Sequence, residues 1–297
     1  MAQDKTPLFV SDLDGTLLSS RPDLSGRSRE TLNRLVEGGA LFTAASARAV
    51  PSMRLLLQGL RLRLPVIGFN GGLISDLETG VHQTILHIDS DVARAIHERL
   101  NTHGAWPALS TFDGECDNLY FGPQRNEGMD YYAREREVAG DARLRRVDDT
   151  AVGLSERLLG FTSIAPIGEL DQLVEELQGD FGPHIRIQYF EDIYLRGWKW
   201  LMIHHHRATK DRAIDALIAS RPELADRPLV VFGDHDNDIP MFRRADYAVA
   251  LKNAQDNVKA EADEIIGSND ADSVALFIEQ ALANGFTEKI QKKKRKG

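Results

Sequence analysis

The sequence places two aspartates directly after one short apolar segment, and this pairing constrains the fold more than any other feature. Leu8 to Ser11 has the apolar and small residues of a buried strand, and Asp12 and Asp14 follow it ahead of a Gly-Thr turn. Side chains two residues apart in a strand point the same way, so both carboxylates share one direction unless the strand has already unwound. They repel one another unless a cation lies between them or one is protonated. The pattern predicts a charged site at the carboxyl end of a strand, where open α/β sheets bind ligands.

An exposed turn or part of a calcium loop would also contain an Asp-x-Asp-Gly string. The apolar segment before Asp12 and the apolar pair Leu17-Leu18 after it favour a buried strand end instead. A second apolar run, Val230 to Phe232, repeats the arrangement, because Gly233 and the carboxylate-rich segment Asp234 to Asp238 follow it.

The first 80 residues alternate between strand and helix patterns. A helix capped by Ser28 and ended by Gly38-Gly39 precedes a strand at Leu41 to Ala45, and a helix from Pro51 precedes a strand at Pro65 to Phe69. Strands separated by single helices predict right-handed crossovers and a parallel, doubly wound sheet.

The pattern changes between about residues 83 and 200 and then returns. Helix-like stretches near 90–102 and 168–178 mix with strands expected at Trp106 to Phe112, Asn118 to Phe121, Leu158 to Ala165 and Ile185 to Phe190. The alternation resumes with a helix at Thr209 to Ala219, strands at Pro228 to Phe232 and Tyr247 to Leu251, and a closing helix from Asp272. We expect a discontinuous core domain over 1–82 and 201–297, an inserted α+β domain over 83–200, and hinges at the two crossings.

Composition excludes several classes of partner. With 297 residues, 42% hydrophobic residues and a formal net charge of -9, the chain has the make-up of a globular protein and disfavours nucleic acid as a partner. It lacks an apolar leader and any run of about eighteen apolar residues, so neither export nor a membrane span is expected. The single cysteine, Cys116, forms no internal disulfide and fits a reducing cytoplasm. The basic stretch Lys292 to Lys296 predicts a disordered tail over residues 287–297.

The segment Asp12-Leu13-Asp14-Gly15-Thr16 resembles the first signature motif, DxDGT, of the haloacid dehalogenase superfamily of phosphatases and phosphotransferases. The resemblance implies that Asp12 is the nucleophile that attacks phosphorus. It also implies that Asp14 protonates the leaving oxygen and later deprotonates the attacking water.

Three further segments occur in the same order as the motifs of the Cof-like branch of that superfamily. Ser46-Ala47-Arg48 resembles the Thr-Gly-Arg motif of that branch. The resemblance implies that the Ser46 hydroxyl donates to a phosphate oxygen. Ala47 replaces the glycine of the motif, and its methyl group is expected to restrict how closely the backbone approaches the substrate. Asn70 lies in an Asn-Gly pair and Asn253 in Leu-Lys-Asn-Ala, which departs from the usual Met-Gly-Asn-Ala. Ser46, Ala47, Arg48, Asn70 and Asn253 are therefore the expected substrate-binding residues, although a helix cap at Ser46 and a simple turn at Asn70 remain alternatives.

Lys210 lies near the start of a predicted helix. A cation there interacts unfavourably with the helix dipole and destabilises the helix by roughly a few tenths of a kcal/mol. An exposed helix lysine is one interpretation. The resemblance implies the other, an active-site lysine that stabilises the phosphate and the nucleophilic carboxylate.

Gly233 to Asp238 matches the motif GDxxND, and the resemblance implies a magnesium site there. Asp12 and Asp234 are expected to bind the ion through their side chains and Asp14 through its carbonyl, while Asn237 and Asp238 complete or orient the shell. Oxygen ligands of this kind suit Mg²⁺.

Together these motifs imply a doubly wound, Rossmann-like α/β core with an inserted α+β cap. The implied activity is that of a magnesium-dependent phosphatase acting on a small phosphomonoester, such as a sugar phosphate, through an aspartyl phosphate. A phosphotransferase or phosphosugar mutase on the same core is the nearest alternative. A non-catalytic module that senses phosphate or metal is another, but the presence of Asp14 argues against it, since phosphate binding needs no acid.

Overall fold

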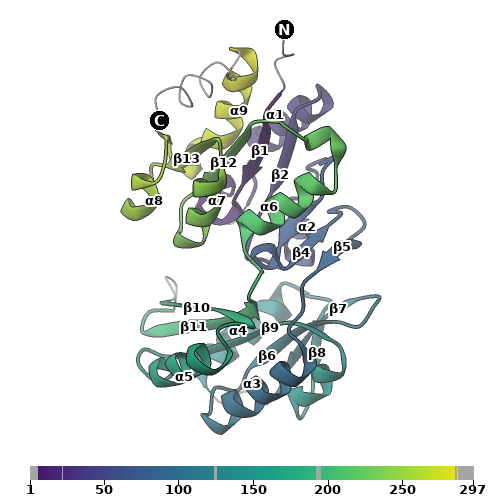
Figure 1. The fold of residues 1–297 in the computed structure, drawn as a ribbon, viewed down its shortest axis with the longest axis vertical. Helices are drawn as coiled ribbons and strands as arrows, with labels where there is room; N and C mark the ends of the chain where they lie inside the picture. The colour runs from purple at the N-terminus through teal and green to yellow at the C-terminus, as the bar shows by residue number, and fades with distance from the viewer. Residues whose placement is uncertain (1–5, 22, 124–125, 192–194, 285, 287–297) are drawn as a thin grey trace. The chain divides into compact units, whose positions relative to one another are not determined.

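The structure is a computed structural model that describes residues 6–21, 23–123, 126–191, 195–284 and 286. The chain forms two compact units, of which the first comprises Met1–Thr84 with Thr209–Gly297 and the second Ile85–Ala208. The basic tail expected over 287–297 lies outside the described residues. Figure 1 shows that each unit contains a sheet with helices packed on it.

The first unit is built on a parallel sheet with the strand order β14-β13-β12-β1-β2. Within it β1 pairs in parallel with β12 on one side and with β2 on the other. This arrangement confirms the expected doubly wound core. The strands are β1 (Leu8–Ser11), β2 (Leu41–Ala44), β12 (Leu229–Gly233), β13 (Tyr247–Leu251) and β14 (Glu264–Ile266).

Helices cover both faces of this sheet because alternate strand residues point to opposite sides. Val10 and Val231 join one apolar cluster with helices α6 (Lys210–Ala219) and α7 (Ile239–Arg244). On the other face Phe232 contacts Phe9 and Phe277 of α9 (Ser273–Ala283). The remaining helices of this unit are α1 (Gly26–Glu37), which contacts α9, α2 (Val50–Leu56) and α8 (Asp256–Ala260).

The strand expected at Pro65 to Phe69 forms, but its main partner differs from the expectation. β3 (Val66–Gly68) pairs antiparallel with β4 (Leu73–Ser75), and β5 (His82–Ile85) completes this small sheet. A parallel bridge between Ala45 and Ile67 lies between this sheet and the parallel sheet. The chain reverses because Phe69, Asn70 and Gly71 have φ values of 50°, 54° and 105°.

Helix α1 begins three residues earlier than expected. Ser25, and not Ser28, is its N-cap, and the Ser25 hydroxyl accepts a hydrogen bond from the Ser28 backbone N–H over 3.0 Å. Ser25 and Ser28 are three residues apart, and either could cap the helix. Ser25 is the N-cap because its hydroxyl oxygen accepts a hydrogen bond from the amide at position N3.

The second unit contains a six-stranded sheet with the order β10-β11-β9-β6-β7-β8. Adjacent strands run antiparallel except for β7 and β8. The helices α3 (Ser90–Thr102) and α5 (Asp171–Phe181) pack on one apolar cluster, and α4 (Glu127–Val138) packs on another. The strands are β6 (Ala108–Phe112), β7 (Asp117–Phe121), β8 (Leu144–Arg146), β9 (Arg157–Pro166), β10 (Ile185–Glu191) and β11 (Trp198–His205).

The expected crossing near residue 200 falls inside β11. This strand pairs with β9 and with β10 along its length, so the second unit continues to Ala208. The histidines at positions 204 and 205 are its last two residues.

The helices are short, and α3 has 13 residues. A bilayer span needs about 20 apolar residues. Among the described residues, every helix is too short or too polar to cross a membrane.

Candidate active site

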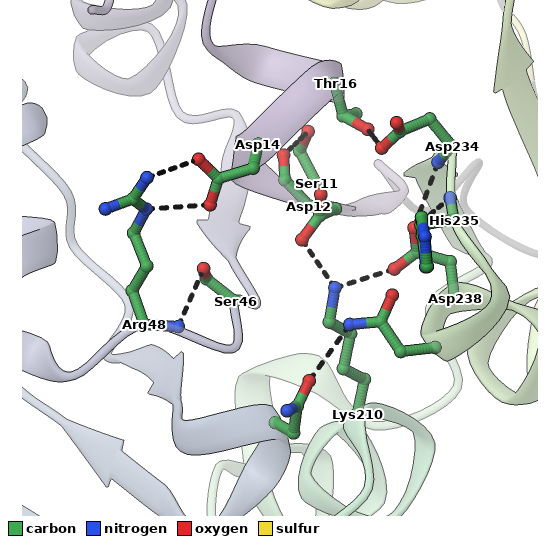
Figure 2. A network of polar contacts seen from close by, with 12 residues as sticks. Ser11, Asp12, Asp14, Thr16, Ser46, Arg48, Lys210, Asp234, His235 and Asp238 are labelled. Carbon is green, nitrogen blue, oxygen red and sulfur yellow. Dashed lines mark hydrogen bonds and ion pairs between the residues drawn. The ribbon is translucent and has the colours of Figure 1, made fainter. Parts of the chain in front are cut away.

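A buried lysine lies between two aspartates at the carboxyl end of the parallel sheet (Figure 2). Asp12 follows β1, and its backbone N–H donates to the carbonyl of Phe232 over 2.9 Å. The Nζ of Lys210, the first residue of α6, donates to Oδ1 of Asp12 over 2.5 Å and to Oδ1 of Asp238 over 2.6 Å. Lys210 is 1% exposed. The fold thus joins three distant segments through one ammonium group.

Asp234 adds a third carboxylate to this place. One oxygen from each of Asp12, Asp234 and Asp238 lies within 4.8 Å of the other two. Burial raises the pKa of Asp234 to about 6, and the nearby carboxylate of Asp238 also raises it. Burial likewise raises the pKa of Asp12, although the ammonium of Lys210 opposes the change.

Lys210 remains charged in this setting. Burial alone disfavours its ammonium form, but the carboxylates of Asp12 and Asp238 more than offset that effect and raise the pKa of Lys210. Three carboxyl groups therefore lie around one ammonium, and two of them are in direct contact with it. The donors of this carboxyl cluster are oxygens only, and this set fits a hard divalent cation such as Mg²⁺.

Two glycines allow these carboxylates to approach the backbone. Gly15 has φ +73°, and a Cβ at that position would lie 2.3 Å from Oδ2 of Asp234. A Cβ on Gly233 would lie 2.6 Å from the side chain of Asp238. The turn after Asp12 is closed against Asp234 by Thr16, whose hydroxyl donates to Oδ1 over 2.8 Å.

Thr16 is a contact that the sequence analysis did not assign. The signal was present, because Thr16 is the last residue of the segment that resembles DxDGT. Its hydroxyl engages the same carboxylate that the second motif supplies.

The side chain of Asp14 points away from Lys210 and toward Arg48 (Figure 2). Nε and Nη2 of Arg48 donate to the two oxygens of Asp14, each over 2.7 Å. The backbone N–H of Arg48 donates to the hydroxyl of Ser46 over 3.1 Å. Ser46 is fully buried, and the intervening Ala47 is half-buried. The segment expected to contact substrate therefore lies beside Asp14.

The asparagines of the sequence motifs link neighbouring loops. Asn237 donates from Nδ2 to Oδ1 of Asn70 over 3.0 Å, and the backbone N–H of Asn70 donates to the carbonyl of Ser46 over 2.9 Å. Asn253 donates from Nδ2 to the carbonyl of Gly15 over 2.7 Å. Each site residue expected from the sequence belongs to the first unit.

Comparison with known proteins agrees with this geometry. Residues 9–278 match the family model of the haloacid dehalogenase-like hydrolases. The 5-amino-6-(5-phospho-D-ribitylamino)uracil phosphatase YwtE of Bacillus subtilis is 27% identical, over 93% of this chain and 98% of its own. The pyridoxal phosphate phosphatase YbhA of Escherichia coli is 28% identical, over 92% and 97%.

The fold also matches a solved structure. A haloacid dehalogenase-like hydrolase from Bacteroides thetaiotaomicron superposes with a TM-score of 0.75 at 25% identity, covering 93% of this chain and 99% of the other. The family match, the phosphatase relatives and the shared fold lead to one conclusion. The chain belongs to the haloacid dehalogenase-like hydrolases, in their Cof-like branch, and is a phosphoric monoester hydrolase.

Proposed function

We propose that this phosphatase hydrolyses a small phosphomonoester in two in-line steps, with Asp12 as the nucleophile, Asp14 as acid and then base, and Mg²⁺ as cofactor. The observation that carries the proposal is the position of Lys210 between Asp12 and Asp238, with Asp234 beside them. Catalysis of phosphoryl transfer depends mainly on placing charge around the transferred group, and this cluster supplies charges of both signs.

In the first step an oxygen of Asp12 attacks phosphorus and the bond from phosphorus to the ester oxygen breaks. Asp14 gives a proton to the departing alkoxide, so the products are an alcohol and a phosphoryl group on Asp12. Lys210 holds Oδ1 of Asp12 by a hydrogen bond, which orients the carboxylate. We assign the buried hydroxyl of Ser46 to a phosphate oxygen, with Lys210 as the cation nearest the nucleophile.

In the second step Asp14 takes a proton from water, and the resulting hydroxide attacks phosphorus. The bond from phosphorus to Asp12 breaks, which releases inorganic phosphate and restores the carboxylate. Both oxygens of Asp14 accept hydrogen bonds from the guanidinium group of Arg48. To transfer a proton in either step, Asp14 must therefore break one of these hydrogen bonds, or one of its oxygens must accept from Arg48 and contact the reacting group at the same time.

Asp12 and Asp234 would hold the metal through their side chains and Asp14 through its carbonyl. Asp238 lies in the same cluster, but its Oδ2 accepts the backbone N–H groups of Asp234 and His235 over 2.9 and 3.1 Å. We assign it, with Asn237, to orienting the loop that carries Asp234. A bound Mg²⁺ would offset negative charge on the phosphoryl oxygens.

For the substrate we propose a small phosphorylated metabolite of the sugar phosphate type. The relatives named above act on a phosphorylated ribityl compound and on pyridoxal phosphate, both small monoesters. The second unit is proposed as the cap that selects among such compounds. It contains a cavity of about 340 Å³ with Trp106, Met129 and Asp148 in its lining.

The first test of this function is a screen of phosphorylated sugars, nucleotides and cofactors with Mg²⁺, followed by Asp12→Asn on the best substrate. The variant should lose turnover and should not form the beryllofluoride adduct that mimics an aspartyl phosphate. Turnover near the wild-type rate would exclude Asp12 as nucleophile. Release of free phosphate indicates hydrolysis, whereas an isomerised sugar phosphate would identify a mutase.

The metal assignment is tested separately. Asp234→Asn should weaken Mg²⁺ binding measured by calorimetry and lower turnover even at raised magnesium. An unchanged dependence on magnesium would place the metal elsewhere.

The cap assignment needs its own comparison. Trp106→Ala should change relative activity among the substrates found in the screen and leave the magnesium requirement intact. Substitutions in this lining that never alter substrate preference would contradict the assignment.

A further inference from the structure

The segment from Asn269 to Asp272, which lies shortly after β14, holds the chain just after the turn that carries Asp14. Asn269 donates from Nδ2 to the carbonyl of Leu18 over 3.0 Å, in a buried position. The carboxylate of Asp270 accepts the backbone N–H and the hydroxyl of Ser20 over 2.8 and 2.7 Å. The carboxylate of Asp272 accepts the hydroxyls of Ser25 and Ser28. Three side chains of one short segment thus bind residues 18–28.

A second connection runs from the same segment into the turn itself. The backbone N–H of Asn269 donates to Oδ1 of Asn253 over 3.0 Å. Because an amide has one acceptor oxygen and one donor NH₂ group, this contact leaves Nδ2 of Asn253 to donate to the carbonyl of Gly15 over 2.7 Å. Asn269 therefore reaches the turn twice, at Gly15 through Asn253 and at Leu18 directly.

The turn needs such support because its own backbone is irregular. Asp14 and Gly15 have non-helical φ/ψ values of -72°/123° and 73°/-1°. The bond that closes the turn runs from the N–H of Leu18 to the carbonyl of Leu13 over 2.8 Å. Since Asn269 binds the carbonyl of that same Leu18, it holds the residue whose N–H closes the turn that carries Asp14.

We propose that Asn269 is a positioning residue of the active site, which acts through Leu18 and Asn253 to hold the turn from Leu13 to Leu17 and so the side chain of Asp14. The proposal rests on the acid role of Asp14 stated above. Asn269 is 8% exposed, and each contact described here lies within the first unit.

The test compares kcat/KM across a series of substituted phenyl phosphates in the full-length enzyme with Mg²⁺. A misplaced acid penalises poor leaving groups most, so a plot of log(kcat/KM) against leaving-group pKa becomes steeper. A lower amount of folded enzyme would shift the whole plot without changing its slope. Asn269→Ala should steepen the slope and cost about tenfold more for phenyl phosphate than for 4-nitrophenyl phosphate.

Asn33→Ala is the matched control. Asn33 makes the same kind of link elsewhere in the first unit, because its Nδ2 donates to the carbonyl of Gly59 over 2.9 Å and its Oδ1 accepts the N–H of Arg61 over 2.8 Å. This variant should leave the slope unchanged. Should Asn269→Ala fail to fold, Asn253→Ala tests the same connection from an exposed side chain.

Asp14→Asn, measured in the same series, separates the acid role of Asp14 from the positioning role of Asn269. If Asp14→Asn steepens the slope but neither Asn269→Ala nor Asn253→Ala does, the positioning role is overturned while the proposed function stands. If Asp14→Asn leaves the slope unchanged, the acid role falls and the positioning role falls with it. A steeper slope in Asp14→Asn and in Asn269→Ala supports both.

Discussion

Arg48 binds Asp14 in a bidentate manner, because Nε and Nη2 of its guanidinium group each donate a hydrogen bond of 2.7 Å to a different carboxylate oxygen. A fork of this kind fixes the direction of a carboxylate as well as its distance, which a lysine cannot do. The contact suggests that Arg48 acts on catalysis through Asp14 more than by holding substrate.

We therefore expect Arg48→Lys to lower kcat by about tenfold and to leave KM within about twofold, because the charge stays but the alignment of the acid is lost. Steady-state kinetics on one phosphomonoester measures both constants. Arg243→Lys is the control, since Arg243 makes a similar contact to Glu261 on the surface of the first unit. A rise in KM at constant kcat would instead assign Arg48 to substrate binding.

Lys210→Met should destabilise the protein as well as inactivate it. The change leaves the buried carboxylates of Asp12 and Asp238 without their cation, and breaking a buried pair from one side costs about 3–5 kcal/mol. Urea unfolding gives the free energy. Lys199→Met removes the half-buried partner of the exposed Asp171 and should cost under about 1 kcal/mol. Equal losses in the two variants would contradict the buried charge cluster.

Gly15→Ala should weaken the response to magnesium. The new Cβ would lie 2.3 Å from Oδ2 of Asp234, so the turn or the carboxylate must move. Gly39→Ala meets a comparable backbone restriction at φ +98° but has nothing within 4 Å. Both variants should lose about 1 kcal/mol of unfolding free energy. Only Gly15→Ala should raise the Mg²⁺ concentration that gives half-maximal activity, and a similar rise in Gly39→Ala would show that the contact with Asp234 is not the cause.

His204 should make the protein less stable in mild acid. Burial lowers its pKa to about 4 from an ordinary value of 6.5, and Arg186 on the adjacent strand also lowers it. Above pH 6.5 the imidazole is neutral in both the folded and the unfolded chain. As the pH falls toward 4 the unfolded chain takes up the proton first, so stability is lost, by about 3 kcal/mol in total.

The measurement is the unfolding free energy of wild type and His204→Gln between pH 7 and pH 4. The wild-type curve should fall more steeply, because the variant lacks the titrating group. His206→Gln, at an exposed position, controls for removing a histidine. Parallel curves for wild type and His204→Gln would rule out the proposed contribution.

The sequence was most informative where a buried strand ends in charged residues. Asp12 and Asp234 follow apolar runs that form β1 and β12, and Lys210 begins a helix with a regular apolar face. Such signals are local, so they are visible without the fold. The contact between Lys210 and Asp238 spans 28 positions and that with Asp12 spans 198, and only the folded sheet brings them together.

Other features had no such signal. Helix α4 buries little beyond Gly128, Met129 and Ala133 within 12 residues, so its apolar period is sparse. The extent of β11 was not predicted, because its tryptophans and histidines do not alternate clearly between apolar and polar residues. Asn269 lies in a polar turn, and nothing in its neighbours reveals that it contacts Leu18, 251 positions away.

The division of the first unit between two stretches of chain has a consequence for how the protein is made. During synthesis β1 and β2 emerge early, but β12, which must pair with the other edge of β1, follows only after the entire second unit. For that interval an apolar strand edge stays unpaired, a state prone to aggregation. Asp12, the proposed nucleophile, is thus translated near the start and Lys210 more than two thirds of the way along, so the nascent chain completes the second unit before it contains Lys210, Asp234 or Asp238.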